Sequence, residues 1–147
     1  MKALLCAEYG PPQNLTVQDV PSPKAAPGQV VVDVKASALN FPDALMVQGL
    51  YQVKPPLPFT PGAEVAGLVK AVGDGVQDLN PGDRVIGFPG TGGFAEECVV
   101  AAERIMPLPE SMDFATGAAL VLTYGTSLHA LQDCGRLQPG ETLLVLG

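Results

Sequence analysis

Few side chains in this sequence are of types that carry metal-binding or nucleophilic chemistry. The chain contains three cysteines, Cys6, Cys98 and Cys134, and a single histidine, His129. The cysteines lie far apart and form no Cys-x-x-Cys pair, so their spacing predicts neither a disulfide framework nor a zinc site. Buried free thiols are the expectation for all three. An imidazole can act as a general acid, but a lone histidine in a helical segment is more often structural.

The remaining candidates are neutral hydrogen-bonding groups. The amide of Asn40 can donate and accept hydrogen bonds, the hydroxyl of Thr126 can do the same, and the phenol of Tyr51 can bond a carbonyl. Each also has a structural explanation. Asn40 could fill a left-handed turn position, Thr126 could cap a helical break, and Tyr51 could cover a loop. The residue types alone leave both interpretations open.

Composition restricts the size and the partners of the protein. The 147 residues suit one domain, the 47% hydrophobic content excludes disorder, and 17 glycines with 15 prolines predict many turns. The net charge is −7 and the eight basic residues are scattered, so neither nucleic acid nor an anionic membrane is an expected partner. The N-terminus has no signal-peptide pattern and no segment is apolar enough to span a membrane, so we expect a cytoplasmic protein.

The first hundred residues are predicted to form short strands separated by turns. Residues 29–36 are rich in β-branched side chains, and residues 15–20 alternate between apolar and polar types. Glycine and proline clusters such as Pro81-Gly82-Asp83 predict the turns. Further strands are predicted near residues 4–5, 64–72, 84–87, 94–100 and 105. Short strands at this spacing are typical of a barrel or a sandwich.

The last third of the chain has a different pattern. Apolar residues recur at roughly helical spacing over residues 113–134 without a proline, which predicts one or two helices. Ser111 or Asp113 is expected to cap the start, and Gly135 is expected to adopt the left-handed conformation after the end. Residues 142–146 are apolar almost throughout, which predicts a buried parallel strand.

A buried parallel strand needs neighbouring strands and crossover helices. Because the 147 residues supply none for the strand at 142–146, we expect the chain to be the front of a longer protein. On this interpretation the chain stops where a βαβ nucleotide-binding domain begins. The alternative is a complete small domain with a C-terminal strand.

Several short segments follow one another at a specific spacing. They are Met1-Lys2-Ala3 with Tyr9-Gly10, ALNFPD at 38–43, GLY at 49–51, PFTPGAEVAG at 58–67, PGDRV at 81–85, GGFAE at 92–96, TYGT at 123–126 and PGET at 139–142. One such segment alone is a weak signal, but their order and spacing together are specific. Over nearly the whole chain they resemble the medium-chain dehydrogenase/reductase superfamily, and within it the zinc-independent quinone oxidoreductase group.

This resemblance implies a fold that is mainly β with C-terminal helices. A GroES-like, partly open β-barrel would form the catalytic domain over residues 1–122. Residues 123–147 would form a connecting helix and the first strand of a truncated Rossmann domain. Glycine lets the backbone approach a dinucleotide pyrophosphate, and the glycine-rich turn of that domain would begin at Gly147. The main NADPH-binding site is therefore expected beyond residue 147.

Two positions depart from the zinc-containing members of the superfamily. Asn40 stands where those enzymes have a cysteine ligand, and Ala63 stands where they have the histidine of a Gly-His-Glu run. Neither side chain replaces a thiolate or an imidazole at zinc, so no metal is expected. Asp43 and Glu64 are then interpreted as structural. The reaction implied is hydride transfer from NADPH to a quinone or an activated alkene without zinc.

The resemblance also implies roles for individual residues. Asn40 and Tyr51 are expected to be catalytic, and Asn40, Phe41, Thr123 and Thr126 are expected to contact the cofactor. The implied function is an NADPH-dependent quinone or enone reductase with a small-molecule substrate. The full-length enzyme is expected to be a homodimer, and the fragment alone is expected to be inactive. The alternative from a different class is a non-enzymatic GroES-like binding module.

Overall fold

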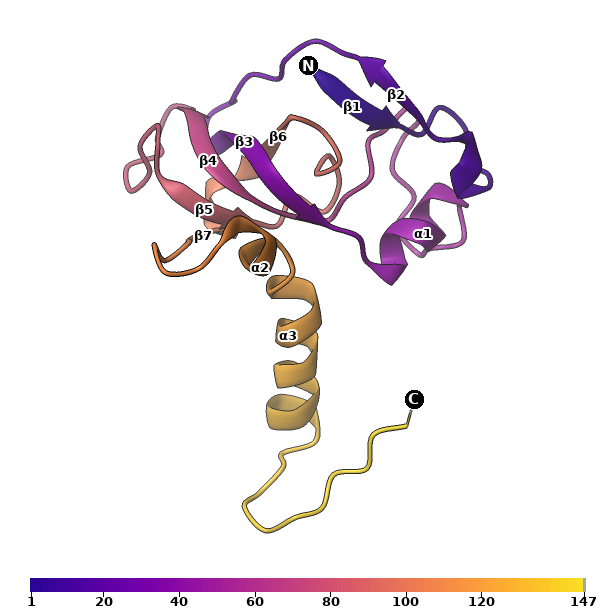
Figure 1. Cartoon of the computed structure of the whole chain (residues 1–147), viewed down its shortest axis with the longest axis vertical. Coiled ribbons are helices and arrows are strands. Elements are labelled where there is room, and N and C mark those ends of the chain that lie inside the picture. Colours follow the sequence, from indigo (N-terminus) through magenta and orange to yellow (C-terminus); the bar gives the residue numbers. More distant parts are fainter. Residues whose placement is uncertain (147) are drawn as a thin grey trace.

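Two antiparallel sheets form most of the structure, a computed structural model that describes residues 1–146 (Figure 1). The smaller sheet pairs β1 (Lys2–Leu5) with β2 (Thr16–Asp19). The larger sheet has the strand order β6-β3-β4-β5-β7. Its strands are β3 (Gln29–Ala38), β4 (Glu64–Val72), β5 (Arg84–Gly87), β6 (Glu97–Ala101) and β7 (Ile105–Pro107). Within the described residues the edge strands β6 and β7 do not pair, so this sheet is not closed into a barrel.

The strands predicted before residue 110 form at or close to the predicted positions. The β-branched run is the long strand β3, which pairs with β4 on one side and with β6 on the other. β4 and β5 begin and end at the predicted residues. Between them the chain turns at Gly82, whose positive φ of 97° is a conformation that favours glycine. The fold class, mainly β with C-terminal helices, is confirmed.

The helices differ in part from the prediction. The segment 113–134 contains α2 (Phe114–Ala118), α3 (Val121–Leu128) and one π-helical stretch (His129–Cys134), with a break before α3. Asp113 caps α2 as predicted, because its carboxylate accepts a hydrogen bond from the Thr116 N–H at 2.7 Å. Helix α1 (Phe41–Val47), between β3 and β4, was not predicted. Two single 3-10 turns occur at Pro12–Asn14 and Ala102–Arg104.

Two predictions for the C-terminal segment are wrong. Gly135 has φ −77°, and the left-handed residue is Arg136 with φ 50°. Residues 142–146 form no strand, and the side chains of Leu144 and Leu146 are 77% and 83% exposed. A strand needs a partner for its backbone hydrogen bonds, and no described strand pairs with this segment. The glycine turn expected at Gly147 lies outside the described residues.

The main core lies on one face of the larger sheet. Alternate residues of adjacent strands meet there, as expected for side chains with a period of two. The buried members are Val30, Val32, Val65, Val69, Val85, Cys98 and Val100. A second cluster joins β1 to α1 through Cys6, Met46, Val47 and Phe59. A third lies under α2 and contains Ala66, Ile86, Leu108 and Ala118.

The three thiols have different environments. Cys6 and Cys98 are buried as predicted, whereas Cys134 is exposed, so the expectation of burial is wrong for that residue. Burial raises the pKa of the Cys98 thiol to about 12, which leaves it protonated and inert near neutral pH. Cys134 is exposed like the rest of its helical stretch, His129–Cys134, which contains no buried residue.

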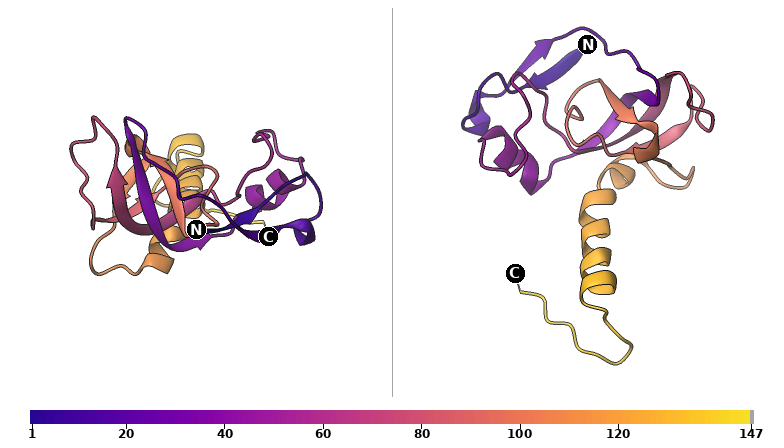
Figure 2. Two further views of the ribbon diagram at one scale, coloured as in Figure 1. Left: turned by 90° about the horizontal axis from the view of Figure 1, so that it is seen from above. Right: turned by 180° about the vertical axis from the view of Figure 1, so that it is seen from behind.

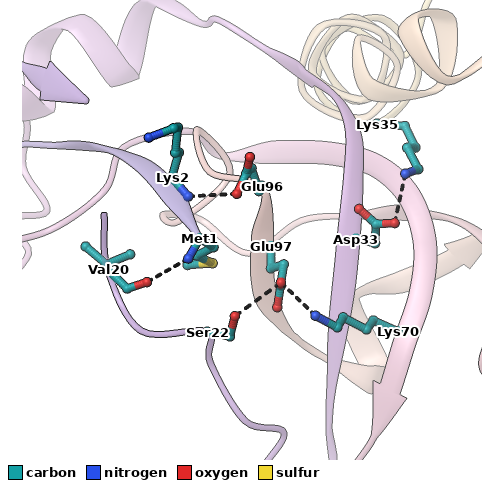
Figure 3. A network of polar contacts seen from close by, with 9 residues as sticks. All are labelled: Met1, Lys2, Val20, Ser22, Asp33, Lys35, Lys70, Glu96 and Glu97. Atoms are coloured by element: carbon teal, nitrogen blue, oxygen red, sulfur yellow. Dashed lines mark hydrogen bonds and ion pairs between the residues drawn. The ribbon is translucent and has the colours of Figure 1, made fainter. Parts of the chain in front are cut away.

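Polar contacts attach the N-terminus to the larger sheet (Figure 3). The amino group of Met1 donates to the Val20 carbonyl oxygen at 2.9 Å, and the Lys2 N–H donates to the Glu96 carboxylate at 2.8 Å. Lys70 on β4 donates to Glu97 on β6 at 2.7 Å. The Lys2–Glu96 contact joins β1 to the segment that leads into β6, the Met1–Val20 contact closes the end of the β1–β2 pair, and the Lys70–Glu97 contact spans β3 within the larger sheet.

Helix α3 projects away from both sheets (Figures 1 and 2). Only its first residues are partly buried, and its residues from 123 onward are exposed. The position of α3 is therefore set at its N-terminal end. Within residues 1–146 no helix has both the length and the hydropathy needed to cross a membrane.

Candidate functional site

Asn40 lies at the junction between β3 and α1. Its φ of −119° and ψ of 158° are extended, so the interpretation as a left-handed turn residue is wrong. Asn40 is the N-cap of α1, and the Asp43 carboxylate three residues later accepts from the Asn40 N–H at 2.9 Å. This reciprocal arrangement is a capping box, which starts the helix at this position. The residue is only 8% exposed.

The Asn40 amide is held by a buried carboxylate. Its Nδ2 donates to Glu64 Oε1 at 2.9 Å, and Glu64 is fully buried at the start of β4. The other oxygen, Glu64 Oε2, accepts from the Leu122 N–H at 2.9 Å. Leu122 is in the first turn of α3, where a negative charge stabilises the unpaired N–H groups. One carboxylate thus joins the β3–α1 junction to α3.

A second buried carboxylate lies beside the first. Asp43 is 1% exposed and accepts hydrogen bonds from the Asn40 N–H and, at 3.1 Å, from the Gly62 N–H. Burial raises the pKa of the Asp43 carboxyl above its ordinary value, and the charge of Glu64 raises it further, although the two N–H donors oppose the increase. Within residues 1–146 no lysine or arginine forms an ion pair with either carboxylate. The site is therefore acidic and built from backbone and amide donors.

The other candidate residues occupy different surroundings. Phe41 follows Asn40 and is 75% exposed. Thr123 and Thr126 are exposed on α3, one and four residues after Leu122, whose N–H donates to Glu64. The Thr123 hydroxyl donates to the Ala119 carbonyl oxygen at 2.6 Å.

Thr126 and Tyr51 differ in their surroundings. Within residues 1–146 the Thr126 hydroxyl forms no hydrogen bond, so it is open to a ligand. Tyr51 is partly buried against the cluster that contains Met46 and Phe59. Its predicted catalytic role is untested and stays a prediction.

The sequence interpretation missed the connecting role of Glu64. It assigned Glu64 and Asp43 to structure in general, without a contact partner for either. A signal was present, because Glu64 is an acidic residue directly before the apolar run Val65–Val69 of its strand. Such a charge is buried only when hydrogen-bonded partners surround it.

The grooves of the surface lie elsewhere. A groove of about 1010 Å³ runs along the loop 75–79 and β7, between residues such as Val76 and Leu108. None of the candidate residues lines it. The candidate residues on the β3–α1 junction and on α3 therefore lie outside this groove.

We expect purified protein to carry no stoichiometric zinc. The resemblance implies that Asn40 and the buried Ala63 occupy the two zinc-ligand positions, and neither offers a thiolate or imidazole donor. Elemental analysis of protein made without a metal-affinity tag measures this, with a zinc-loaded and dialysed sample as the control. One equivalent of zinc retained against a chelator would contradict the expectation.

The fold and this site define a dehydrogenase-type GroES-like domain. The chain belongs to the alcohol dehydrogenase GroES-like domain family, whose model matches residues 26–110, more than half of the chain. It falls in the quinone oxidoreductase group of the medium-chain dehydrogenase/reductase superfamily, as the resemblance predicted. Quinone oxidoreductase-like protein 2 of Bos taurus is 42% identical over 144 residues, which are 98% of this chain and 41% of the relative.

Solved structures agree with this assignment. A probable oxidoreductase from Mycobacterium abscessus has a TM-score of 0.89 at 43% identity, over 96% of this chain and 45% of the other. The quinone oxidoreductase from Thermus thermophilus, solved alone and in complex with NADPH, has a TM-score of 0.81 at 34% identity, over 96% and 43% of the two chains. This chain thus spans less than half the length of these proteins.

Proposed function

We propose that this chain is the catalytic domain of an NADPH-dependent quinone or enone reductase. In this reaction a hydride passes directly from the nicotinamide to a quinone or to an alkene conjugated to a carbonyl, without zinc. The observation that carries the proposal is the convergence of Asn40 and the start of α3 on Glu64. By the resemblance, Asn40 and the neighbouring Ala63 stand where zinc enzymes of the superfamily have metal ligands. A neutral amide and a free hydroxyl suit orientation of a cofactor and a carbonyl substrate better than metal binding.

The proposed cofactor is NADPH, whose main binding site would lie beyond residue 147. The NADPH complex of the Thermus thermophilus relative supports this choice. In this chain, the residues that would meet the nicotinamide end are Asn40, Phe41, Thr123 and Thr126. The Thr126 hydroxyl fits that role because it has no hydrogen bond within the described residues. The Thr123 hydroxyl would first have to leave the Ala119 carbonyl.

The remaining parts of the proposal concern the whole protein. Residues 1–122 would be the catalytic domain, and residues 123–147 would lead into a nucleotide-binding domain. We propose a cytoplasmic homodimer that acts on small molecules and not on nucleic acid or membranes. The net charge of −7 supports the exclusion of polyanionic partners.

Turnover assays test the proposed function. The chain, extended by the coding sequence that follows it, is assayed with NADPH and NADH against a panel of quinones and enones. We expect turnover with NADPH and at least one member of the panel. A coding sequence that stops after Gly147, or an extended protein with no turnover, would instead favour the non-enzymatic binding module.

The 147-residue chain alone is expected to bind NADPH only weakly and to show no turnover. Most of the affinity for a dinucleotide comes from the pyrophosphate, which a glycine-rich turn and the N-terminus of the next helix bind. Calorimetric titration of the chain with NADPH, beside the extended protein as the control, measures the difference. Micromolar affinity of the chain would show that its own residues bind the phosphates.

A further inference from the structure

Glu64 connects two parts of the molecule that are far apart in sequence. Its two oxygens accept from Asn40, 24 residues away, and from Leu122, 58 residues away. The side chain is completely buried, so water does not compete for either bond. A fully buried carboxylate is retained only if its hydrogen bonds compensate for the lost hydration.

The attachment of α3 to the β-sheets is narrow. Leu120 and Val121 pack against the apolar cluster under α2. The bond from the Leu122 N–H to Glu64 is the polar contact that joins the first turn of α3 to β4. Beyond this turn the helix is exposed. The direction in which α3 leaves the domain therefore depends on this first turn.

We propose that Glu64 is the positioning residue of the site: its carboxylate holds the Asn40 amide and helix α3 in one fixed relation. The kinetic consequence of this inference rests on the proposed function, but its structural consequence does not. If α3 moves relative to Asn40, Thr126 moves with it. The Asn40 amide and the Thr126 hydroxyl would then no longer be positioned to contact the same ligand.

Glu64→Gln tests this inference with almost no change in shape. A carboxylate accepts from both donors, whereas glutamine has one acceptor oxygen and presents an NH2 group on the other side. The Leu122 N–H can only donate, so the oxygen must face it. The NH2 group then faces Asn40 Nδ2, so the Asn40 amide can keep a bond to residue 64 only by turning over, which takes its oxygen away from the Asp43 N–H of the capping box.

Amide hydrogen exchange of the 147-residue chain reports the local effect. We expect Glu64→Gln to lower the protection of the Leu122 N–H about 10-fold, because residue 40 then holds the glutamine less firmly and the oxygen that accepts from Leu122 is no longer fixed in place. The protection of the Val32 N–H in the centre of the sheet is expected to stay unchanged. Glu97→Gln is the matched control, because Glu97 is mostly buried on β6 but pairs with Lys70 and not with α3.

A second substitution restores the pairing with reversed polarity. In Glu64→Gln combined with Asn40→Asp, the glutamine NH2 donates to the new aspartate while its oxygen still accepts from Leu122. Aspartate is as good an N-cap as asparagine, so α1 is expected to persist. We expect the double variant to recover most of the lost protection at Leu122, as a coupled pair should.

The outcomes separate a positioning role from general stabilisation. Equal loss of protection at Leu122 and Val32, no loss at Leu122, or no recovery in the double variant would each overturn the inference. In the extended protein, Glu64→Gln is expected to lower kcat about 10- to 100-fold with little change in KM or in NADPH affinity. If the extended wild-type protein shows no turnover, the proposed function fails while the exchange data still decide the role of Glu64.

Discussion

Gly67→Ala is expected to lower the free energy of unfolding by about 3 kcal/mol or more, because the new methyl group would collide with the neighbouring strand. A Cβ at this position of β4 would lie 2.1 Å from the Asp33 carbonyl oxygen and 2.9 Å from Val32 Cγ1. The closest atom belongs to the backbone of β3, which is held between β4 and β6. The collision therefore cannot be relieved by rotating a side chain.

Denaturant unfolding of the chain measures this loss. Gly125→Ala is the control, because Gly125 is in α3 and a Cβ there would meet no atom within 4 Å apart from its chain neighbours and the backbone of its own helix. Alanine in an exposed helix is expected to stabilise it by about 0.5–1 kcal/mol. Equal stability of Gly67→Ala and the wild type would mean that β3 and β4 are further apart than the structure has them.

The strands were predictable because their signal is local. β3 is a run of β-branched residues, and β4 and β5 are bounded by glycine and proline turns. Helix α1 was not predicted because it has only seven residues and contains Pro42, a residue type that usually ends a helix. Proline is tolerated in the first turn of a helix, and the capping pair Asn40 and Asp43 was the signal that marked its start.

The C-terminal errors have another cause. Hydrophobicity marks residues 142–146 as a segment suited to burial, but it does not supply the strands against which to pair. Where no partner is present among the described residues, the segment remains extended and exposed. The sequence of residues 142–146 is the same whether or not partner strands are present, so it cannot predict the outcome.

The site was predictable only in part. Asn40 and Thr126 came from a family resemblance, and the structure brings Asn40 and the start of α3 to one carboxylate. That carboxylate bonds to residues 24 and 58 positions away, and no local pattern carries such information. The buried charge at Glu64 could be noticed in the sequence, but its partners could not.

Thr126→Ala and Asn40→Ala are expected to lower turnover of the extended protein about 100-fold while weakening NADPH binding far less. Both residues are proposed to meet the nicotinamide end, where a displacement of about 1 Å costs roughly 100-fold in rate. Loss of one neutral hydrogen bond weakens binding by only about 0.5–1.5 kcal/mol, since the phosphates supply most of the affinity. Single-turnover kinetics with a separate measurement of NADPH affinity distinguishes the two effects.

Thr126 provides the cleaner of these two tests. Its side chain is exposed and its hydroxyl forms no hydrogen bond within residues 1–146, so its removal should hardly change stability. Asn40→Ala, by contrast, leaves the buried Glu64 Oε1 without its donor and also destabilises the fold. Ser127→Ala is the matched control, because that hydroxyl donates to the Thr123 carbonyl of its own helix at 2.9 Å. Wild-type hydride-transfer rates in both Thr126→Ala and Asn40→Ala would show that neither residue acts on the reaction.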